Sequence, residues 1–120
     1  MKIYVAHAGD FDYENKLYIP IKASNLAKEH EFFLPHEKEN DFNTKEVIKT
    51  VDLLVADISQ PSTGVGMEIG RAEAAGVSVL FVSEKGAKIS TSLNYVSDQF
   101  IEYEDSNDLI AKLREYISSR

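Results

Sequence analysis

Short apolar runs alternate with amphipathic stretches along the whole chain. The apolar runs have the length of buried strands, and the stretches between them repeat apolar residues at helical spacing, which is typical of βαβ units. No repeat, low-complexity tract or linker interrupts this alternation, so we expect a single domain over residues 1–120. The apolar runs predict strands over Ile3–Ala8, Glu31–Leu34, Asp52–Ile58, Val77–Val82 and Phe100–Tyr103.

Helices are predicted between these strands from capping residues and apolar stripes. Pro20 suits the first turn of a helix, although a start further upstream with a kink at Pro20 also fits the pattern. Gly76 is placed to end the helix before it, because glycine readily adopts the left-handed conformation of a helix C-cap. The predicted helices are Pro20 to about His30, Asn43 or Thr44 to Val51, Gly66–Ala75, Thr91–Val96, and Asp105 or Ser106 to about Ser118.

Five strands with intervening helices predict an α/β fold. The expected architecture is a doubly wound, five-stranded parallel sheet of the Rossmann-like or flavodoxin-like kind, with strand order 2-1-3-4-5. In such a sheet ligands bind at the carboxyl ends of the strands, at the point where the strand order reverses. That point lies between the first and third strands here. We therefore expect the functional site to follow the strands that begin at Ile3 and Asp52.

Composition narrows the classes of function. The 120 residues include 20 acidic residues and 13 Lys and Arg, for a formal net charge of −7. This balance argues against binding to polymeric nucleic acid, which needs clustered cations. The chain has no cysteine, which excludes disulfides, zinc thiolate sites and a cysteine nucleophile. No apolar run approaches the ~20 residues of a membrane span, and the first residues predict a strand, so we expect a cytoplasmic protein without membrane contact.

The segment Asp57–Ala72, with the sequence DISQPSTGVGMEIGRA, follows the predicted third strand. Gly64 and Gly66 would let the backbone approach a ligand and point N–H groups at an anion, and Ser62 adds a hydroxyl. Glu68 is predicted in the first helical turn, where the helix dipole favours a carboxylate. The segment is neither a Walker loop nor a dinucleotide fingerprint. The alternative is a tight turn followed by an acid that only complements the dipole.

This segment, followed by Gly76-Val77-Ser78-Val79, resembles the signature of the nucleoside 2-deoxyribosyltransferase family. Within the family, the pattern QPS-x-GVG-x-E-[IL]-GRA is most similar to the 2′-deoxynucleoside 5′-phosphate N-hydrolase branch. The resemblance implies cleavage of an N-glycosidic bond, or 2-deoxyribosyl transfer. It also implies that Glu68 attacks C1′ of the sugar and forms a covalent glycosyl-enzyme. By the same resemblance, Ser62, Gly64 and Gly66 would hold a 5′-phosphate.

Two further positions follow from the resemblance. Tyr4 resembles a family tyrosine at the edge of the active site, although a tyrosine in a first strand is often a core residue. Ser92 falls where the N-hydrolases place a serine that reaches the neighbouring subunit's phosphate site, so a homodimer is implied. On chemistry alone Ser92 is a solvent-exposed serine. The implied partner is a small nucleotide or nucleoside, with no cofactor.

The sequence also departs from the family pattern. Ala8 and Asp10 fall near the positions of a serine and an arginine that bind phosphate, and an aspartate there would repel phosphate. Thr44 falls at the position of an aspartate that handles the base and its proton, with Asp41 nearby. The alternative function is therefore a non-catalytic nucleotide-binding module of the same fold.

Histidines and aromatic residues supply the remaining candidates. His7 ends the first predicted strand, where it could donate to a phosphate or transfer a proton with Asp10 orienting it. A capping or solvent-facing histidine is the alternative. Tyr13 and Tyr18 fall in a segment that could cover the site or pack on the domain surface. The other histidines have no metal-ligand spacing, so no metal site is expected.

Overall fold

Parallel strands form a single five-stranded sheet in the computed structural model, which describes residues 1–37 and 42–120. The strand order is β2-β1-β3-β4-β5, so the predicted fold class and order are confirmed. Ala6 of β1 pairs with Ala56 of β3, which brings the carboxyl ends of these two strands together. The strands are β1 (Lys2–Ala6), β2 (Glu31–Phe33), β3 (Leu53–Asp57), β4 (Ser78–Glu84) and β5 (Phe100–Tyr103).

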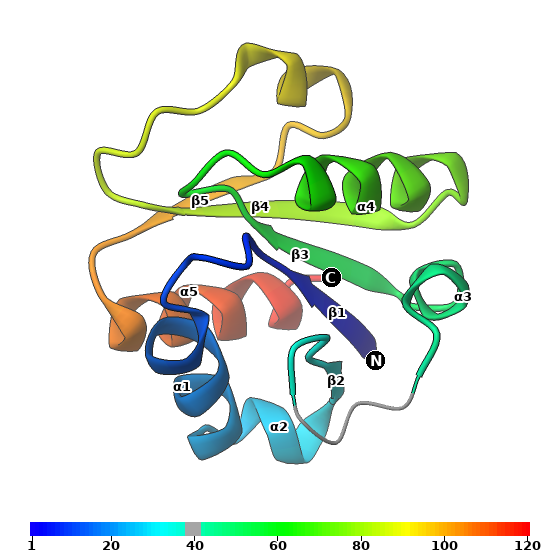
Figure 1. Cartoon of the computed structure of the whole chain (residues 1–120). Helices are drawn as coiled ribbons and strands as arrows, with labels where there is room; N and C mark the ends of the chain where they lie inside the picture. Colours follow the sequence, from blue (N-terminus) through cyan, green and yellow to red (C-terminus); the bar gives the residue numbers. More distant parts are fainter. Residues whose placement is uncertain (38–41) are drawn as a thin grey trace.

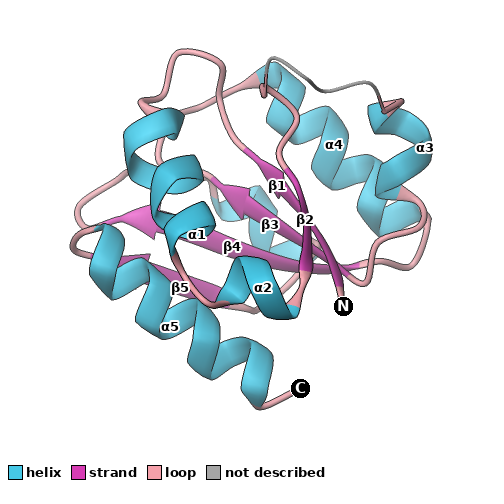
Figure 2. Ribbon diagram, turned by 90° about the horizontal axis from the view of Figure 1, so that it is seen from below, coloured by secondary structure: helices cyan, strands magenta, loops and turns pink. Residues whose placement is uncertain are grey.

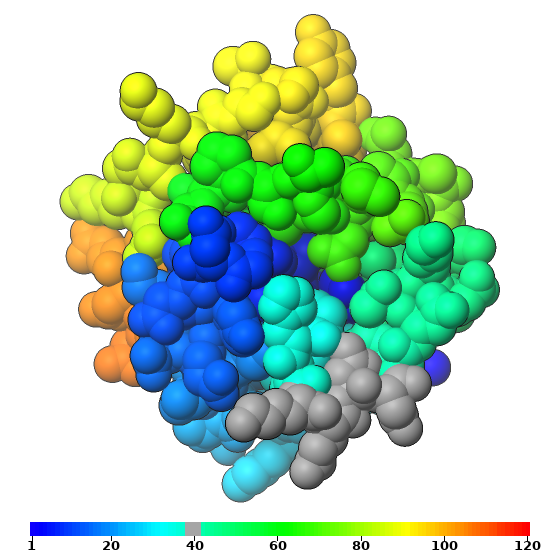
Figure 3. All heavy atoms as spheres, viewed as in Figure 1, coloured from blue at the N-terminus to red at the C-terminus, as the bar shows by residue number. Residues whose placement is uncertain are grey.

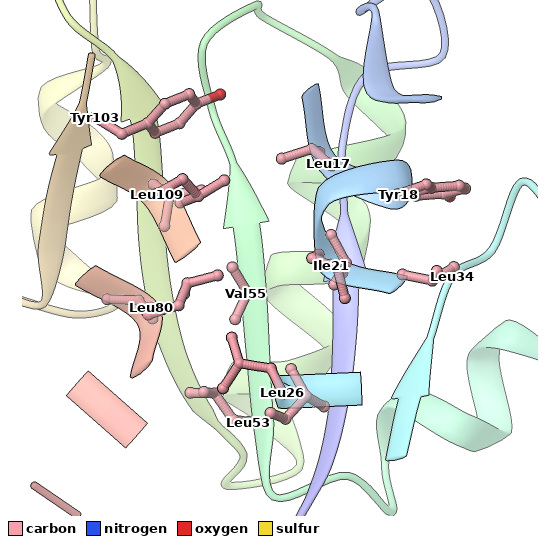
Figure 4. Packing of buried hydrophobic residues seen from close by; sticks show 14 of the residues in the cluster. Leu17, Tyr18, Ile21, Leu26, Leu34, Leu53, Val55, Leu80, Tyr103 and Leu109 are labelled. Carbon is pink, nitrogen blue, oxygen red and sulfur yellow. The ribbon is translucent and has the colours of Figure 1, made fainter. Parts of the chain in front are cut away.

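Helices cover both faces of this sheet (Figures 1 and 2). One face packs against the first helices and the C-terminal helix, and Figure 4 shows part of this core. The other face packs against the two helices that flank β3 in sequence. The first group is η1 (Glu14–Tyr18, a π-helix), α1 (Ile19–Ala23), α2 (Leu26–Glu29) and α5 (Ser106–Ser118). The second group is α3 (Thr44–Ile48) and α4 (Thr63–Ala74). A short 3₁₀ helix, η2 (Thr91–Tyr95), precedes β5.

Side chains of the buried strands alternate between these two faces, as the period of a strand requires. In β1, Ile3 and Val5 belong to the core under α1 and α5, whereas Tyr4 belongs to the core under α3 and α4. The same alternation continues in β3, where Leu53 faces the first core and Leu54 the second. Both layers are therefore built by one apolar run in each central strand.

The helical connection between β1 and β2 differs from the predicted single helix from Pro20 to His30. The helix starts upstream, at Glu14, and Pro20 lies in the first turn of α1. It is then interrupted at Ser24, whose backbone is extended and whose hydroxyl donates to the Ile21 carbonyl at 2.7 Å. A serine that bonds to nearby backbone competes with the helical ladder, which explains the break.

The start of α4 also differs from the prediction. The helix begins at Thr63, not at Gly66, because the Ser62 hydroxyl oxygen accepts a hydrogen bond from the Val65 N–H at 3.3 Å and caps it. Glu68 therefore lies in the second turn, where the helix dipole acts on it less than predicted, since the effect falls off within the first turn. The predicted end is confirmed: Gly76 follows the helix with φ +75°.

Other boundaries lie close to their predictions. Asn43 caps α3 and Asp105 caps α5, each through its side-chain oxygen. The strand over Phe100–Tyr103 is confirmed, whereas β1 ends at Ala6, two residues early. Within the part of the chain that the structure describes, no helix combines the length and apolarity needed to cross a membrane.

Candidate active site

A hollow of about 310 Å³ opens between α4, the segment after β2 and the start of α3. It lies on the α3 and α4 side of the sheet, and Figure 3 shows it between the green of α4, the cyan of the segment after β2 and the blue-green of α3. This is the place where the strand order reverses and where the topology predicts a ligand. Its lining residues are Tyr4, Pro35, His36, Thr44, Gly64, Met67, Glu68 and Arg71.

Tyr4 and Glu68 meet in this hollow. The Tyr4 hydroxyl donates a hydrogen bond to Oε2 of Glu68. Tyr4 is fully buried, and its ring meets the Phe42 ring edge to face at a centroid distance of 6.4 Å. Burial and the neighbouring Glu68 raise the pKa of the Tyr4 phenol, so it remains a hydrogen-bond donor at neutral pH. Tyr4 is thus a core residue whose polar end reaches the site.

Glu68 is half-buried, and its surroundings shift the pKa of its carboxyl in opposite directions. Burial raises the pKa of Glu68 above its ordinary value, because a charged carboxylate loses hydration. The hydrogen bond from Tyr4 and the neighbouring side chains of His36 and Arg71 oppose this increase. Such a carboxylate is poorly solvated yet held in place, and it can act as a nucleophile or as a base.

His36 is a site residue that the sequence analysis did not identify. It lies in the turn after β2, and its side chain lines the hollow that contains Glu68. A signal was available, because β2 is the neighbour of β1 and their carboxyl ends open at the same edge of the sheet. From the sequence, His36 was considered only as a metal ligand. Among the described residues, no cluster of three or more His, Asp or Glu could hold a metal ion.

Thr44 also lines the hollow, at the first position of α3. The structure therefore brings together Thr44 and Glu68, as the position of Thr44 in the resemblance implied. Asp41, the neighbouring acid considered from the sequence, lies outside the described residues. Of the described lining residues, Glu68 is the one carboxylate.

The three residues expected to form a phosphate cradle are divided between the two flanks of α4. Gly64 lines the Glu68 hollow, whereas Ser62 and Gly66 line a second hollow of about 210 Å³ beside Lys88 and Leu93. The Gly66 N–H donates to the Ser62 carbonyl at 3.1 Å, so it is engaged within the helix. The Gly64 N–H lies in the first turn, whose N–H groups have no acceptor within the helix.

His7 is enclosed rather than open to a ligand. The residue is 4% exposed, and its Nδ1 and Nε2 lie 2.9 Å from the Ala8 carbonyl oxygen and 2.7 Å from the Tyr18 hydroxyl. These groups, not Asp10, orient the ring. Burial lowers the pKa of His7 to about 4. The Tyr13 ring stacks on it at 4.4 Å, and Tyr18 is 2% exposed, so Tyr18 belongs to the core and not to a cover over the site.

Asp10 and Ser92 are both exposed. Asp10 lies in the turn after β1, and Ser92 lies in η2, where its hydroxyl is 2.7 Å from that of Ser90. Neither residue lines the Glu68 hollow. Within one described chain, the residues that gather around Glu68 are therefore Tyr4, His36, Thr44, Gly64 and Arg71.

The chain is similar to proteins that act on nucleosides and nucleotides. A protein of Syntrophotalea carbinolica named "Putative 2′-deoxynucleoside 5′-phosphate N-hydrolase 1" is 51% identical over 41 residues, a stretch that covers 34% of this chain and 29% of that protein. No protein-family model matches the chain.

Two solved structures extend the similarity to nearly the whole chain. A CMP N-glycosidase of Clostridium botulinum has a TM-score of 0.66 at 23% identity, over 95% of this chain and 99% of that one. A 2-deoxyribosyltransferase of Bacillus psychrosaccharolyticus has a TM-score of 0.57 at 26% identity, over 91% and 90% of the two chains. The chain has the fold of the nucleoside 2-deoxyribosyltransferases and N-glycosidases. The resemblance inferred from residues 57–79 is thereby confirmed.

Proposed function

We propose that the protein cleaves the N-glycosidic bond of a (deoxy)nucleoside or its 5′-monophosphate, or transfers the 2-deoxyribosyl group. The observation that carries this proposal is the half-buried Glu68 carboxylate, hydrogen-bonded to Tyr4 in a hollow at the strand-order reversal. The fold shared with a CMP N-glycosidase and a 2-deoxyribosyltransferase supports it.

Glu68 is the proposed nucleophile. A carboxylate oxygen forms a bond to C1′ while the bond from C1′ to the base nitrogen breaks, and the base leaves with the electron pair. Water then attacks C1′ and restores the carboxylate in hydrolysis, whereas a second base takes the sugar in transfer. Tyr4 holds the carboxylate in one orientation through its hydrogen bond. The other carboxylate oxygen, which would attack C1′, is therefore fixed in position before the substrate binds.

The departing base must gain a proton. Among the described lining residues, His36 carries an imidazole, a side chain that can serve as a general acid or base. Arg71 remains charged and can only donate hydrogen bonds. No described acid other than Glu68 lines the hollow. We therefore assign His36 to donate the proton to the leaving base, and Arg71 to donate hydrogen bonds to the polar edge of that base.

The 5′ end of the substrate is proposed to lie at the start of α4. Gly64 offers a backbone N–H there, and Ser62 can donate its hydroxyl proton while its oxygen caps the helix. We propose a homodimer in which Ser92 of one protomer completes this end of the site in the other. The exposed position of Ser92 in η2 leaves it accessible to a second copy.

The test is a base-release assay. The protein is incubated with nucleosides and with deoxy- and ribonucleoside monophosphates, with and without a second base as acceptor, and the released base is measured by chromatography. Glu68→Ala should lower the rate by at least about a thousandfold, as expected for loss of a nucleophile. Glu73 is an exposed acid on the same helix, so Glu73→Ala is the matched control and should leave the rate unchanged. Equal activity in both variants would exclude Glu68 as the nucleophile.

A nucleotide-binding module is the second candidate, and the position of Thr44 in the hollow favours it. A threonine cannot deliver the proton that the resemblance assigns to an aspartate there. Calorimetric titration with monophosphates, run beside the base-release assay, separates the two functions. Saturable binding without release of any base would establish the module and reject the enzyme.

A further inference from the structure

A chain of hydrogen bonds links the end of β1 to the wall of the Glu68 hollow. A carbonyl oxygen can only accept, so the contact between His7 Nδ1 and the Ala8 carbonyl requires the proton on Nδ1. In the neutral ring Nε2 must then accept, and the Tyr18 hydroxyl donates to it at 2.7 Å. The lowered pKa of His7 agrees with a neutral ring. The tautomer is therefore fixed by its partners.

The Tyr18 oxygen has a second role. It accepts the backbone N–H of His36 at 2.9 Å, so one buried hydroxyl joins η1, the end of β1 and the turn after β2. The His36 ring also meets the His7 ring edge to face at 4.7 Å. A Cβ placed on Gly9 would lie 3.6 Å from Cε1 of His36, which shows how closely the two loops approach.

Other contacts of the turn that carries His36 are local or lie at the surface. Within the turn, the Glu37 N–H donates to the Leu34 carbonyl at 3.2 Å. Glu37 pairs with Lys22 of α1 at the surface. Surface ion pairs contribute little to holding a backbone, whereas a buried hydrogen bond is costly to break. The hydroxyl of the buried Tyr18 is thus a polar anchor of this wall.

We propose that Tyr18 is a positioning residue for the reaction: its hydroxyl fixes His36 in the wall of the hollow that contains Glu68, and His7 fixes the direction of that hydroxyl. The catalytic consequence rests on the proposed function, whereas the structural link does not. Tyr18→Phe keeps the ring and removes the oxygen, so it leaves the His36 N–H and His7 Nε2 without their partner. Tyr103→Phe is the matched control, since it removes another buried hydroxyl, bonded to Asp57 at 2.6 Å and outside the hollow.

Nuclear magnetic resonance tests the link directly. In the wild-type protein, ¹⁵N shifts should show His7 as the neutral Nδ1–H tautomer between pH 6 and 8, and the His36 amide should exchange slowly with solvent. Tyr18→Phe should shift the His36 amide signal and accelerate its exchange by about tenfold, the scale of one buried hydrogen bond. Tyr103→Phe should leave both unchanged. An Nε2–H tautomer, or a His36 amide that responds equally to both variants, would overturn the proposal.

Kinetics test the catalytic consequence. Tyr18→Phe should lower kcat/KM for base release by roughly tenfold beyond the effect of Tyr103→Phe. The difference should remain even when the two variants unfold at similar temperatures. Equal kinetics in the two variants, with the His36 amide displaced only by Tyr18→Phe, would reject Tyr18 as a positioning residue. If the wild-type protein releases no base from any compound, the proposed function fails, and the magnetic resonance result still decides whether Tyr18 holds the wall.

Discussion

The hydroxyl of Tyr4, a residue of the central strand β1, donates a hydrogen bond to the carboxylate of Glu68 on helix α4. This bond stabilises the ionised carboxylate and so lowers the pKa of Glu68 against the effect of burial. Removing the hydroxyl in Tyr4→Phe should raise the pKa of Glu68. The acidic limb of the pH–rate profile should move to higher pH, so base release should fall most at the acidic end of the profile. An unmoved limb would show that another group controls it.

The two glycines at the start of α4 should respond differently to alanine. Gly66 has nothing within 4 Å of an added Cβ, and Gly64 has only the Ser62 Oγ at 3.8 Å, so both substitutions fit. Each should stabilise the helix by roughly 0.5–1 kcal/mol, because alanine is a better helix former. Base release should fall more in Gly64→Ala, since Gly64 lines the Glu68 hollow. A larger loss in Gly66→Ala would place the 5′ end of the substrate on the other flank.

Ser62 combines a cap with a proposed ligand contact, and two substitutions separate these roles. Ser62→Ala removes the acceptor for the Val65 N–H and should cost roughly 0.5–2 kcal/mol of unfolding free energy. Ser62→Asp restores a cap and should recover stability, but its charge should weaken monophosphate binding more than nucleoside binding. Thermal denaturation and calorimetric titration measure the two effects. Undiminished monophosphate affinity in Ser62→Asp would remove this position from the phosphate site.

The buried His7 predicts a pH dependence of stability. Its pKa is lowered from 6.5 to about 4 by burial and by the neighbouring His36, so below pH 6.5 the unfolded chain binds a proton that the folded chain does not. Stability should fall as the pH decreases from 6.5 to 4, by roughly 3 kcal/mol at most, with no contribution at higher pH. Urea unfolding of wild type and His7→Gln checks this, since the variant should lack that part of the slope. Parallel curves would contradict a neutral buried ring.

The proposed dimer can be tested at η2. Tyr95 is 90% exposed there, and Ile19 in α1 is an apolar residue 51% exposed on the opposite side of the sheet. If the dimer forms through η2, Tyr95→Lys should shift light scattering toward the monomer, whereas Ile19→Lys should leave the mass unchanged. A wild-type monomer at all accessible concentrations would remove Ser92 from the site.

Local patterns were enough to predict the sheet order and most helices, because each apolar run or stripe reports the face that it buries. Caps such as Asn43 and Asp105 were recognisable for the same local reason. The start of α4 was not, since Gly64 and Gly66 favour a loop by propensity while the Ser62 cap extends the helix through them. A specific side-chain cap outweighs the low helix propensity of glycine at such positions.

The candidate site was predictable in part. Glu68 and Tyr4 were identified through the resemblance, and Thr44 lies in the hollow as that alignment placed it. His36 was missed although the predicted strand order places the turn after β2 beside the end of β1, because it was considered only as a metal ligand. His7 was misjudged for the opposite reason: its place at a strand end favours exposure, but Tyr13 and Tyr18 enclose it.

The alternation of side chains in β1 has a consequence for how this protein can change. Tyr4 pairs in register with Phe33 of β2 and Leu54 of β3, so its direction is locked from both sides. An insertion or deletion that shifts the register of β1 by one residue would turn Tyr4 toward α1 and α5, away from Glu68, and would turn the remaining side chains of the strand to the opposite face. Such a change would abolish the site and the packing together. Insertions and deletions should therefore be tolerated in the surface loops but not in this strand.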